Sequence, residues 1–289
     1  MLITGAEGQL GLDLRDAFAD LEPVGLTHQQ LDISDATAVS DALLGSSPDL
    51  VVNAAAWTDV NSCEQDADRA HRVNALGPWW LARACARLEA TLVHVSTDYV
   101  FSGDPPTGPG GQTRGWTKHE PIAPISGYGR SKAAGEALVR ETLAAHHIVR
   151  TSWLNSARGH NFVRTIPRLA NERDYLRVVD DETGCPTFTR DPAAAIRRLT
   201  VSGRYGTIHL VDSGSCTWCG LACASFEIGG HNVEARRTSA QGYGRTAPRP
   251  TWSVIDDRHA RMIDIGPLPP WRESLTALQA EIEAQVDDE

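Results

Sequence analysis

The sequence lacks an excess of basic residues, and it lacks long apolar runs. Its 27 lysines and arginines stand against 37 aspartates and glutamates, so the formal net charge is −10 and the isoelectric point is near 5.5. Nucleic acids and anionic membranes are bound mainly through basic surfaces, so we expect no partner of either kind. The longest apolar stretches, such as Leu50–Trp57, are far shorter than the roughly 18–20 residues that span a bilayer. No basic-then-apolar leader precedes them, and we expect a cytoplasmic protein.

Cysteine is sparse too, at six residues in 289. Without a leader, these are expected to be reduced thiols rather than disulfide bridges. Cys216, Cys219 and Cys223 form a C-x2-C-x3-C cluster, to which His209 or His231 could add a fourth metal ligand. Zinc sites usually draw on two separated pairs of ligands, which favours the simpler interpretation of three small residues on one short helix. We therefore expect no metal.

What the sequence does contain is a regular alternation of strand-like and helix-like segments. Apolar residues make up 41% of the chain and charged residues 22%, as in ordinary globular proteins. The strand-like runs are 2–4, 50–52, 92–95 and 148–149, and apolar residues recur at helical spacing in 10–21, 36–44, 67–88 and 131–145. This alternation predicts an α/β fold, a Rossmann-type doubly wound parallel sheet covered by helices.

The second half of the chain is less regular. We predict an NAD(P)-binding domain over residues 1–150, with a returning segment around 188–212, and a smaller C-terminal α/β substrate domain over most of 151–289. The stretch Ser102–Gly127 is irregular and contains five prolines. Loops of that length in compact domains are usually lids or binding loops, so we expect it to close over a substrate.

A glycine-rich turn follows the first strand. Its glycines have the spacing G-x-x-G-x-x-G and open an amphipathic helix. Without side chains there, backbone N–H groups and the positive end of the helix can approach a pyrophosphate closely. The alternative is a tight turn that needs glycine only for its backbone angles. We expect this turn to bind a dinucleotide through Gly5, Gly8, Gln9, Leu10 and Gly11.

The end of the second strand bears on the choice of dinucleotide. A site that prefers NAD usually has an acidic residue there, which binds the adenosine ribose hydroxyls. Val24–Leu26 runs instead into Thr27–Gln30, which contains no carboxylate. This favours NADPH, with NADH as the alternative because no arginine stands there to hold a 2′-phosphate. Asp32 and Ile33 are further candidates for cofactor binding, and Asp32 could instead cap the helix over 36–44.

Tyr128 and Lys132 lie four residues apart at the start of a helix that Ser126 can cap, so both side chains point the same way. An ammonium group beside a phenol favours the phenolate and lowers a pKa that is about 10 in water. The pair can act as a proton donor, although Y-x-x-x-K is common in surface helices. Thr97 follows the strand over 92–95, at the edge where open parallel sheets bind ligands, and its hydroxyl can hydrogen-bond a carbonyl.

The order of these motifs resembles that of extended short-chain dehydrogenases/reductases, and within them the dTDP-4-dehydrorhamnose reductase family. The resemblance spans nearly the whole chain. Its motifs are NAAAWTDV at 53–60, STDYVFSG at 96–103, YGxxK at 128–132 with Gly135 and Glu136, RTSW at 150–153, NF at 161–162, VVxD at 178–181, GxPT at 184–187, TW at 217–218, and RP at 249–250 with Ser253.

The resemblance implies an NADPH-dependent reduction of the C4 ketone of dTDP-4-dehydro-L-rhamnose to dTDP-L-rhamnose. Thr97, Tyr128 and Lys132 would be the catalytic trio, in which Tyr128 supplies the proton and Thr97 orients the carbonyl. Lys132 would lower the pKa of Tyr128 and hold the hydroxyls of the nicotinamide ribose. Asp98 and Trp153 would line the sugar pocket beside this trio.

Three further features gain a role from the resemblance. The small side chains of Ala54, Ala55 and Ala56 would leave room for the cofactor, with simple close packing as the alternative. Pro78 lies inside the helix predicted over 67–88 and cannot donate to the carbonyl of Asn74. Short-chain reductases use such an asparagine kink in a proton relay, so Asn74 is a candidate relay residue, with a purely structural kink as the alternative. Arg249 is a candidate for binding the anionic substrate.

The chain departs from the family's pattern at Trp57, Asn61, Asn155, Glu182 and Cys185. Several of these positions would lie near the sugar or the cofactor, so a related dTDP-4-keto-6-deoxy sugar, such as the precursor of dTDP-dihydrostreptose, is an alternative substrate. An alternative of another class is a non-catalytic subunit like the regulatory subunit of methionine adenosyltransferase. The presence of the whole catalytic trio disfavours that reading.

Arg190 bears on the oligomeric state. Some family members dimerise through a magnesium ion bound by glutamates, and Arg190 stands at one of those positions. A cation beside a cation is unfavourable. We therefore expect a monomer or a metal-independent homodimer.

Overall fold

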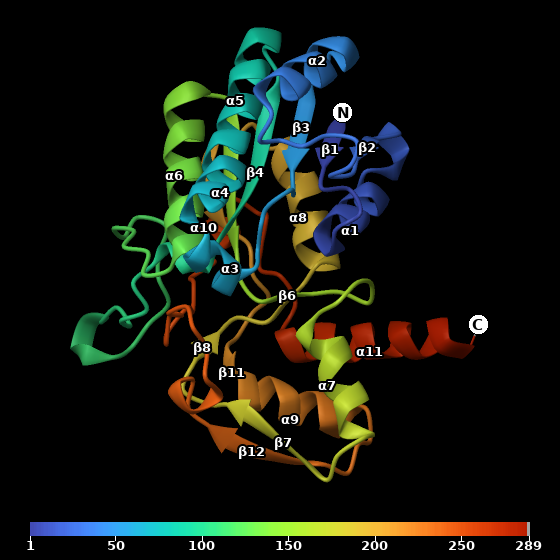
Figure 1. Ribbon diagram of the computed structural model, residues 1–289, viewed down its shortest axis with the longest axis vertical. Coiled ribbons are helices and arrows are strands. Elements are labelled where there is room, and N and C mark those ends of the chain that lie inside the picture. Colours follow the sequence, from blue (N-terminus) through green and yellow to red (C-terminus); the bar gives the residue numbers. More distant parts are fainter. Residues whose placement is uncertain (288–289) are drawn as a thin grey trace.

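The computed structural model describes residues 1–287, and a six-stranded parallel sheet forms its centre (Figure 1). The strand order is β2-β1-β3-β4-β5-β10. The strands are β1 (Leu2–Thr4), β2 (Val24–Leu26), β3 (Leu50–Asn53), β4 (Thr91–Thr97), β5 (His146–Thr151) and β10 (Gly206–His209). The order reverses between β1 and β3, and a ligand crevice of such a sheet is expected outside the carboxyl ends at that point.

Helices cover both faces of this sheet. On one face α1 (Gln9–Ala17) and α8 (Arg190–Thr200) bury Leu14, Phe18 and Ile196 against the strands. On the other face α2 (Ala36–Ser46), α5 (Gly77–Leu88) and α6 (Gly127–Thr142) pack around Val51 and Leu92. The predicted doubly wound α/β fold is confirmed.

The helix predicted over 67–88 is interrupted. The chain forms α4 (Ala67–His71), a π-helical turn over Arg72–Leu76, and then α5, in whose first turn Pro78 lies. The N–H groups in the first turn of a helix have no partner within that helix, so a proline there removes no hydrogen bond of α5. Gly135 of α6 lies directly against the carbonyl of Asn74, where any Cβ would collide. The kink thus lets two helices approach closely.

A smaller lobe lies below the sheet in Figure 1. Its strands β7 (Tyr175–Val179) and β12 (Glu234–Thr238) pair in parallel. The helices α7 (Phe162–Ala170), α9 (Trp218–Ile228) and α11 (Trp271–Asp287) pack beside them around Leu221 and Leu275. Short ladders join β6 (Leu154–Asn155) to β9 (Thr187–Phe188) and β8 (Thr183–Gly184) to β11 (Cys216–Thr217), and two short helices, α3 (Val60–Gln65) and α10 (Arg258–Met262), complete the elements named in Figure 1.

The chain returns from this lobe to the sheet through α8 and β10, both of which follow residue 150. The domain boundaries stay a prediction. Within residues 1–287, no helix is both long and apolar enough to cross a membrane.

The irregular stretch Ser102–Gly127 is anchored to the C-terminal part of the chain. Trp116 stacks on Phe101, with ring centroids 4.8 Å apart and an angle of 7° between the rings. Its backbone N–H donates to the carbonyl of Val254 at 2.8 Å. The stretch extends away from the sheet in Figure 1 rather than over the ends of its strands. Closure over a substrate stays a prediction, because it requires a movement that this structure does not contain.

Candidate active site

A cleft of about 570 Å³ lies at the carboxyl ends of the central strands. The glycine-rich turn before α1 lines it, as do Trp153 and Trp218. The ends of β4 and β5 and the first turns of α6 also contribute lining residues. We call this space the catalytic cleft. The predicted site residues that line it are Gly8, Gln9, Leu10, Gly11, Ala54, Ala56, Thr97, Asp98, Tyr128, Lys132 and Trp153.

The glycine-rich turn has the geometry of an anion site. Gly5 has a φ of +68°, and a Cβ there would collide with the backbone of Ala55. Gly8 precedes the first residue of α1, and the first turn of that helix holds no acidic side chain. Unpaired N–H groups at such a helix start favour a negatively charged group. Gln9 ties this wall to the smaller lobe, since its side chain donates to the carbonyl of His160 at 3.2 Å and accepts from Asn161 at 3.1 Å.

Several predicted cofactor residues support the cleft from behind rather than line it. Asn74 accepts from the backbone N–H of Trp57 at 2.8 Å and donates to its carbonyl at 2.9 Å, so its side chain holds the segment after β3. Ile33 is buried in the core, and Asp32 binds Ser34 in a turn. The cap of α2 is Asp35 rather than Asp32. Gly5 and Ala55 likewise lie behind the lining residues.

The structure brings Thr97, Asp98, Tyr128 and Lys132 together. The Thr97 hydroxyl donates to Asp98 at 2.9 Å, and Ser152 donates to the other carboxylate oxygen at 3.2 Å. Tyr128 and Lys132 come from the first turns of α6, whose start is capped by Ser126 as the sequence predicts. All four side chains line the catalytic cleft.

Burial dominates the electrostatics of this group. It raises the pKa of Asp98 to about 6, against the opposing hydrogen bonds of Ser253, Thr97 and Ser152. It lowers the pKa of Lys132 to about 8. It also raises the pKa of Tyr128 above its ordinary value, opposed by a hydrogen bond with Thr97 and assisted by the charge of Asp98.

The direction for Tyr128 differs from the expectation that Lys132 lowers its pKa. Lys132 is not among the groups that shift the pKa of Tyr128, and its Nζ donates to the carbonyl of Val95 at 2.7 Å. Tyr128 is therefore held as a protonated phenol, which is the form that can donate a proton.

An aromatic stack also lines the cleft. The rings of Trp153 and Trp218 are parallel within 7°, with centroids 3.6 Å apart. Trp153 has a φ of +43°, which non-glycine residues rarely adopt, and a side chain on Gly184 would collide with its ring. The Trp218 indole N–H donates to Glu182 at 3.1 Å, and Arg245 pairs with that same carboxylate. A flat apolar wall of this kind suits the face of a sugar or a base.

Arg249 lies apart from the cleft wall. Its guanidinium donates to Asn61 at 3.3 Å and to the carbonyl of Ala247 at 3.2 Å. Trp218, His160 and Ser152 line the cleft although they were not predicted as site residues. Trp218 belongs to the T-W motif, which could have identified it, whereas His160 lies in a segment without any recognisable pattern.

The cysteine cluster forms no metal site in the described residues. All six thiols are free, with Cys219 buried in the smaller lobe and Cys223 exposed. Among residues 1–287 no three side chains of His, Cys, Asp or Glu gather in a way that could hold a metal ion. His209 is buried on β10, where its Nδ1 hydrogen-bonds the carbonyl of Asp256.

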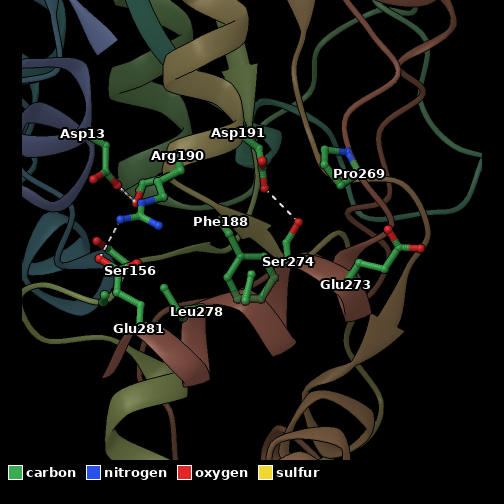
Figure 2. A pocket seen from close by; sticks show the side chains of 13 residues that line it. Asp13, Ser156, Phe188, Arg190, Asp191, Pro269, Glu273, Ser274, Leu278 and Glu281 are labelled. Carbon is green, nitrogen blue, oxygen red and sulfur yellow. Dashed lines mark hydrogen bonds and ion pairs between the residues drawn. The ribbon is translucent and has the colours of Figure 1, made fainter. Parts of the chain in front are cut away.

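A second hollow, of about 280 Å³, lies between α8 and α11 (Figure 2). We call it the α11 groove. Arg190 pairs with Glu281 across it at 2.9 Å, and Ser274 donates to Asp191 at 2.8 Å. Asp13, at its edge, binds Thr189 and Arg158. Most of the polar side chains labelled in this view are thus bound to one another, and Glu273 is the exception.

The fold and the cleft together define a Rossmann-type, dinucleotide-dependent oxidoreductase of the extended short-chain class. Comparison with known proteins identifies the family. The RmlD substrate binding domain family matches residues 1–284, and the chain belongs to it. The resemblance inferred from the sequence is confirmed.

Named relatives agree with this assignment. A dTDP-4-dehydrorhamnose reductase of Mycobacterium tuberculosis is 39% identical over 286 residues, which cover 97% of this chain and 92% of the relative. The spore coat polysaccharide biosynthesis protein SpsK of Bacillus subtilis is 38% identical over 277 residues, 95% of either chain. A crystal structure of dTDP-4-dehydrorhamnose reductase from Bacillus anthracis in complex with NADP has a TM-score of 0.92 at 35% identity and covers 97% of this chain and 98% of its own.

Proposed function

We propose that this protein uses NADPH to reduce the C4 ketone of dTDP-4-dehydro-L-rhamnose, which gives dTDP-L-rhamnose. The observation that carries the proposal is the convergence of Thr97, Tyr128 and Lys132 on one cleft that begins at a glycine-rich turn. A regulatory subunit without chemistry has no need of this convergence. The named reductase relatives and the NADP-bound structure support both the substrate class and the cofactor.

The residues around the turn fit a dinucleotide. The first residues of α1 offer backbone N–H groups to its diphosphate, and the small Ala54 and Ala56 leave space beside them. Lys132 would donate to the nicotinamide ribose. The cofactor, when bound, supplies the hydride.

Tyr128 is the proton donor in this proposal. Negative charge develops on the ketone oxygen only as the hydride arrives, so donors placed there stabilise the transition state more than the ground state. The protonated Tyr128 gives its proton to that oxygen. The Thr97 hydroxyl donates to Asp98 at 2.9 Å in the free protein. It would turn its single proton to the ketone oxygen when the substrate is bound, and so orient that oxygen.

The stacked Trp153 and Trp218 would form the wall against which the sugar lies, and Arg249 would come into use only after a movement toward the diphosphate. We infer a monomer or a metal-independent homodimer, because the Arg190 guanidinium is satisfied by Glu281. We also infer a cytoplasmic enzyme, since six unbridged thiols suit a reducing compartment.

Incubation of the purified protein with NADPH and each of several dTDP-4-keto-6-deoxy sugars tests the proposal. We expect the loss of absorbance at 340 nm to match the appearance of dTDP-L-rhamnose, identified by NMR. If only the dihydrostreptose precursor is turned over, that sugar is the substrate in place of dTDP-4-dehydro-L-rhamnose. No turnover of any keto-sugar would refute the enzymatic function. Light scattering with and without EDTA tests the oligomer, which we expect to be unaffected by the chelator.

A further inference from the structure

A chain of buried polar side chains leads from the first strand to Lys132. Thr4, Asn53, His94 and Lys132 come from β1, β3, β4 and α6, and each is at most 1% exposed. The Thr4 hydroxyl donates to Asn53 Oδ1 at 2.7 Å. Asn53 Nδ2 lies 3.1 Å from His94 Nδ1, and His94 Nε2 lies 3.4 Å from Lys132 Nζ. Nothing in the proposed reaction uses Asn53 or His94.

The hydrogen bonds of Asn53 fix the proton on His94. The backbone N–H of Ala55 can only donate, and it lies 3.1 Å from Asn53 Oδ1, so the amide oxygen must face it. The amide nitrogen Nδ2 therefore faces His94 and donates to Nδ1. A neutral imidazole that accepts at Nδ1 carries its proton at Nε2. That N–H points at Lys132.

Lys132 Nζ already donates to the carbonyl of Val95 at 2.7 Å. An ammonium has three N–H donors and no lone pair, so its contact with His94 Nε2–H would bring two donors together without an acceptor. Such a contact is unfavourable. A neutral amine has a lone pair that can accept this N–H while it still donates to Val95. We propose that His94, held in the Nε2–H form by Asn53, is a positioning residue that disfavours the ammonium form of Lys132.

The other charged groups around Lys132 do not supply this effect. Glu136, one turn along α6, raises the pKa of Lys132, so it opposes the effect of His94. Its carboxylate is held by Arg150 at 2.7 and 2.9 Å and by Ser96 at 2.6 Å. Tyr128, one turn back, is a neutral phenol. His94 itself stays neutral, because burial and the nearby Lys132 hold its pKa well below its usual value.

Only the use of this contact in a reaction rests on the proposed function. A Lys132 with a pKa of about 8 can change its charge as the cofactor and substrate arrive, whereas a lysine with its ordinary pKa stays charged. The contact between His94 and Lys132 exists in the free protein and can be measured there.

The sequence makes the measurement simple, because Lys118 and Lys132 are its only lysines. NMR titration of the protein labelled with ¹³C at lysine Cε would give two signals, and Lys118→Arg assigns them. Three variants are compared with the native protein. In His94→Gln the amide oxygen can accept from the ammonium. In Asn53→Asp a carboxylate accepts from Nδ1–H, which moves the proton away from Nε2. His147→Gln, in the neighbouring strand β5, is the matched control.

We expect His94→Gln and Asn53→Asp each to raise the titration midpoint of Lys132 by about one pH unit, with His147→Gln and the Lys118 signal unchanged. Unfolding curves identify any variant that fails to fold. If one of His94→Gln and Asn53→Asp does not fold, the Lys132 midpoint of the other variant tests the inference. An unchanged or lowered Lys132 midpoint in a folded variant would overturn the inference. If the two variants show these shifts but the native protein reduces no keto-sugar, the proposed function alone is refuted.

Discussion

The catalytic cleft and the α11 groove both hold carboxyl groups whose pKa is shifted, but their surroundings differ. In the cleft, Asp98 has a pKa of about 6 and lies beside Tyr128 and Lys132, which face open space. Behind the groove, burial and the neighbouring Asp191 raise the pKa of Asp212 to about 9. A perturbed pKa is often taken as the mark of an active site. These two carboxyl groups teach that a shifted pKa marks a candidate active site only where other titratable side chains line the same cavity.

The largest effect is expected from Tyr128→Phe, which tests the cleft side of the comparison. The substitution removes the proton donor and leaves the ring in place. We expect kcat to fall by about 10³-fold, within the range of a lost general acid. NADPH binding, followed by fluorescence, and the melting temperature are expected to stay at native values. Activity within a few-fold of native would show that another group donates the proton.

A smaller loss is expected from Asp98→Asn. The carboxylate accepts from Thr97 through one oxygen and from Ser152 through the other. Below about pH 6 a proton occupies one of these two oxygens, so the carboxyl group can no longer accept from both hydroxyls. The kcat/KM of the native protein should therefore fall as the pH drops through 6. We expect the variant to lose about tenfold in kcat/KM at pH 7.5, because an amide N–H₂ can turn toward Thr97, and to lack this acidic limb. A pH profile measures both, and an acidic limb that persists in the variant would assign it to another group.

On the groove side, Asp212→Asn should change stability rather than activity. The folded protein keeps a proton on Asp212 up to about pH 9, while the unfolded chain loses it near 3.8. Because the folded state binds more protons in this window, the free energy of unfolding of the native protein falls as the pH rises through it.

The asparagine removes this titration and keeps an acceptor for the N–H of Phe188. We expect about 1 kcal/mol more stability at pH 8, roughly 2–4 °C in melting temperature, little change at pH 4, and native kcat. Thermal unfolding at the two pH values decides. A folded variant that has lost activity would show that the α11 groove also serves the reaction. The contrast between the groove and the catalytic cleft would then be wrong.

The smallest effect is expected from Arg190→Ala. The Arg190 side chain is 63% exposed and its partner Glu281 is 18% exposed. Exposed ion pairs of this kind contribute about 0–1 kcal/mol, so unfolding by urea should change by less than that, and kcat should not change. A drop of several kcal/mol, or a changed oligomer by light scattering, would give the groove a role in assembly.

The sequence predicted the sheet and the meeting of Thr97, Tyr128 and Lys132 at one cleft because both rest on local patterns. Alternating apolar runs locate the strands, and Y-x-x-x-K and the end of β4 are read directly from the chain. His94 could not be found this way. It is a single polar residue inside the apolar run 92–95, and its contacts arise only when β3, β4 and α6 pack together.

Other features depended on packing in the same way. The π turn over Arg72–Leu76 lies against Gly135, a partner 59 or more residues further along the chain. The expected effect of Lys132 on Tyr128 failed to appear because helical spacing places two side chains on one face but does not choose their hydrogen bonds. Val95 binds the Lys132 Nζ instead.

The most direct test of the whole account is NADPH consumption with dTDP-4-dehydro-L-rhamnose by the native protein and by Tyr128→Phe, with the product identified by NMR. We predict one NADPH oxidised for each dTDP-L-rhamnose formed by the native protein, and a rate about 10³-fold lower in the variant. No oxidation by the native protein, or equal rates in the two proteins, would contradict the account.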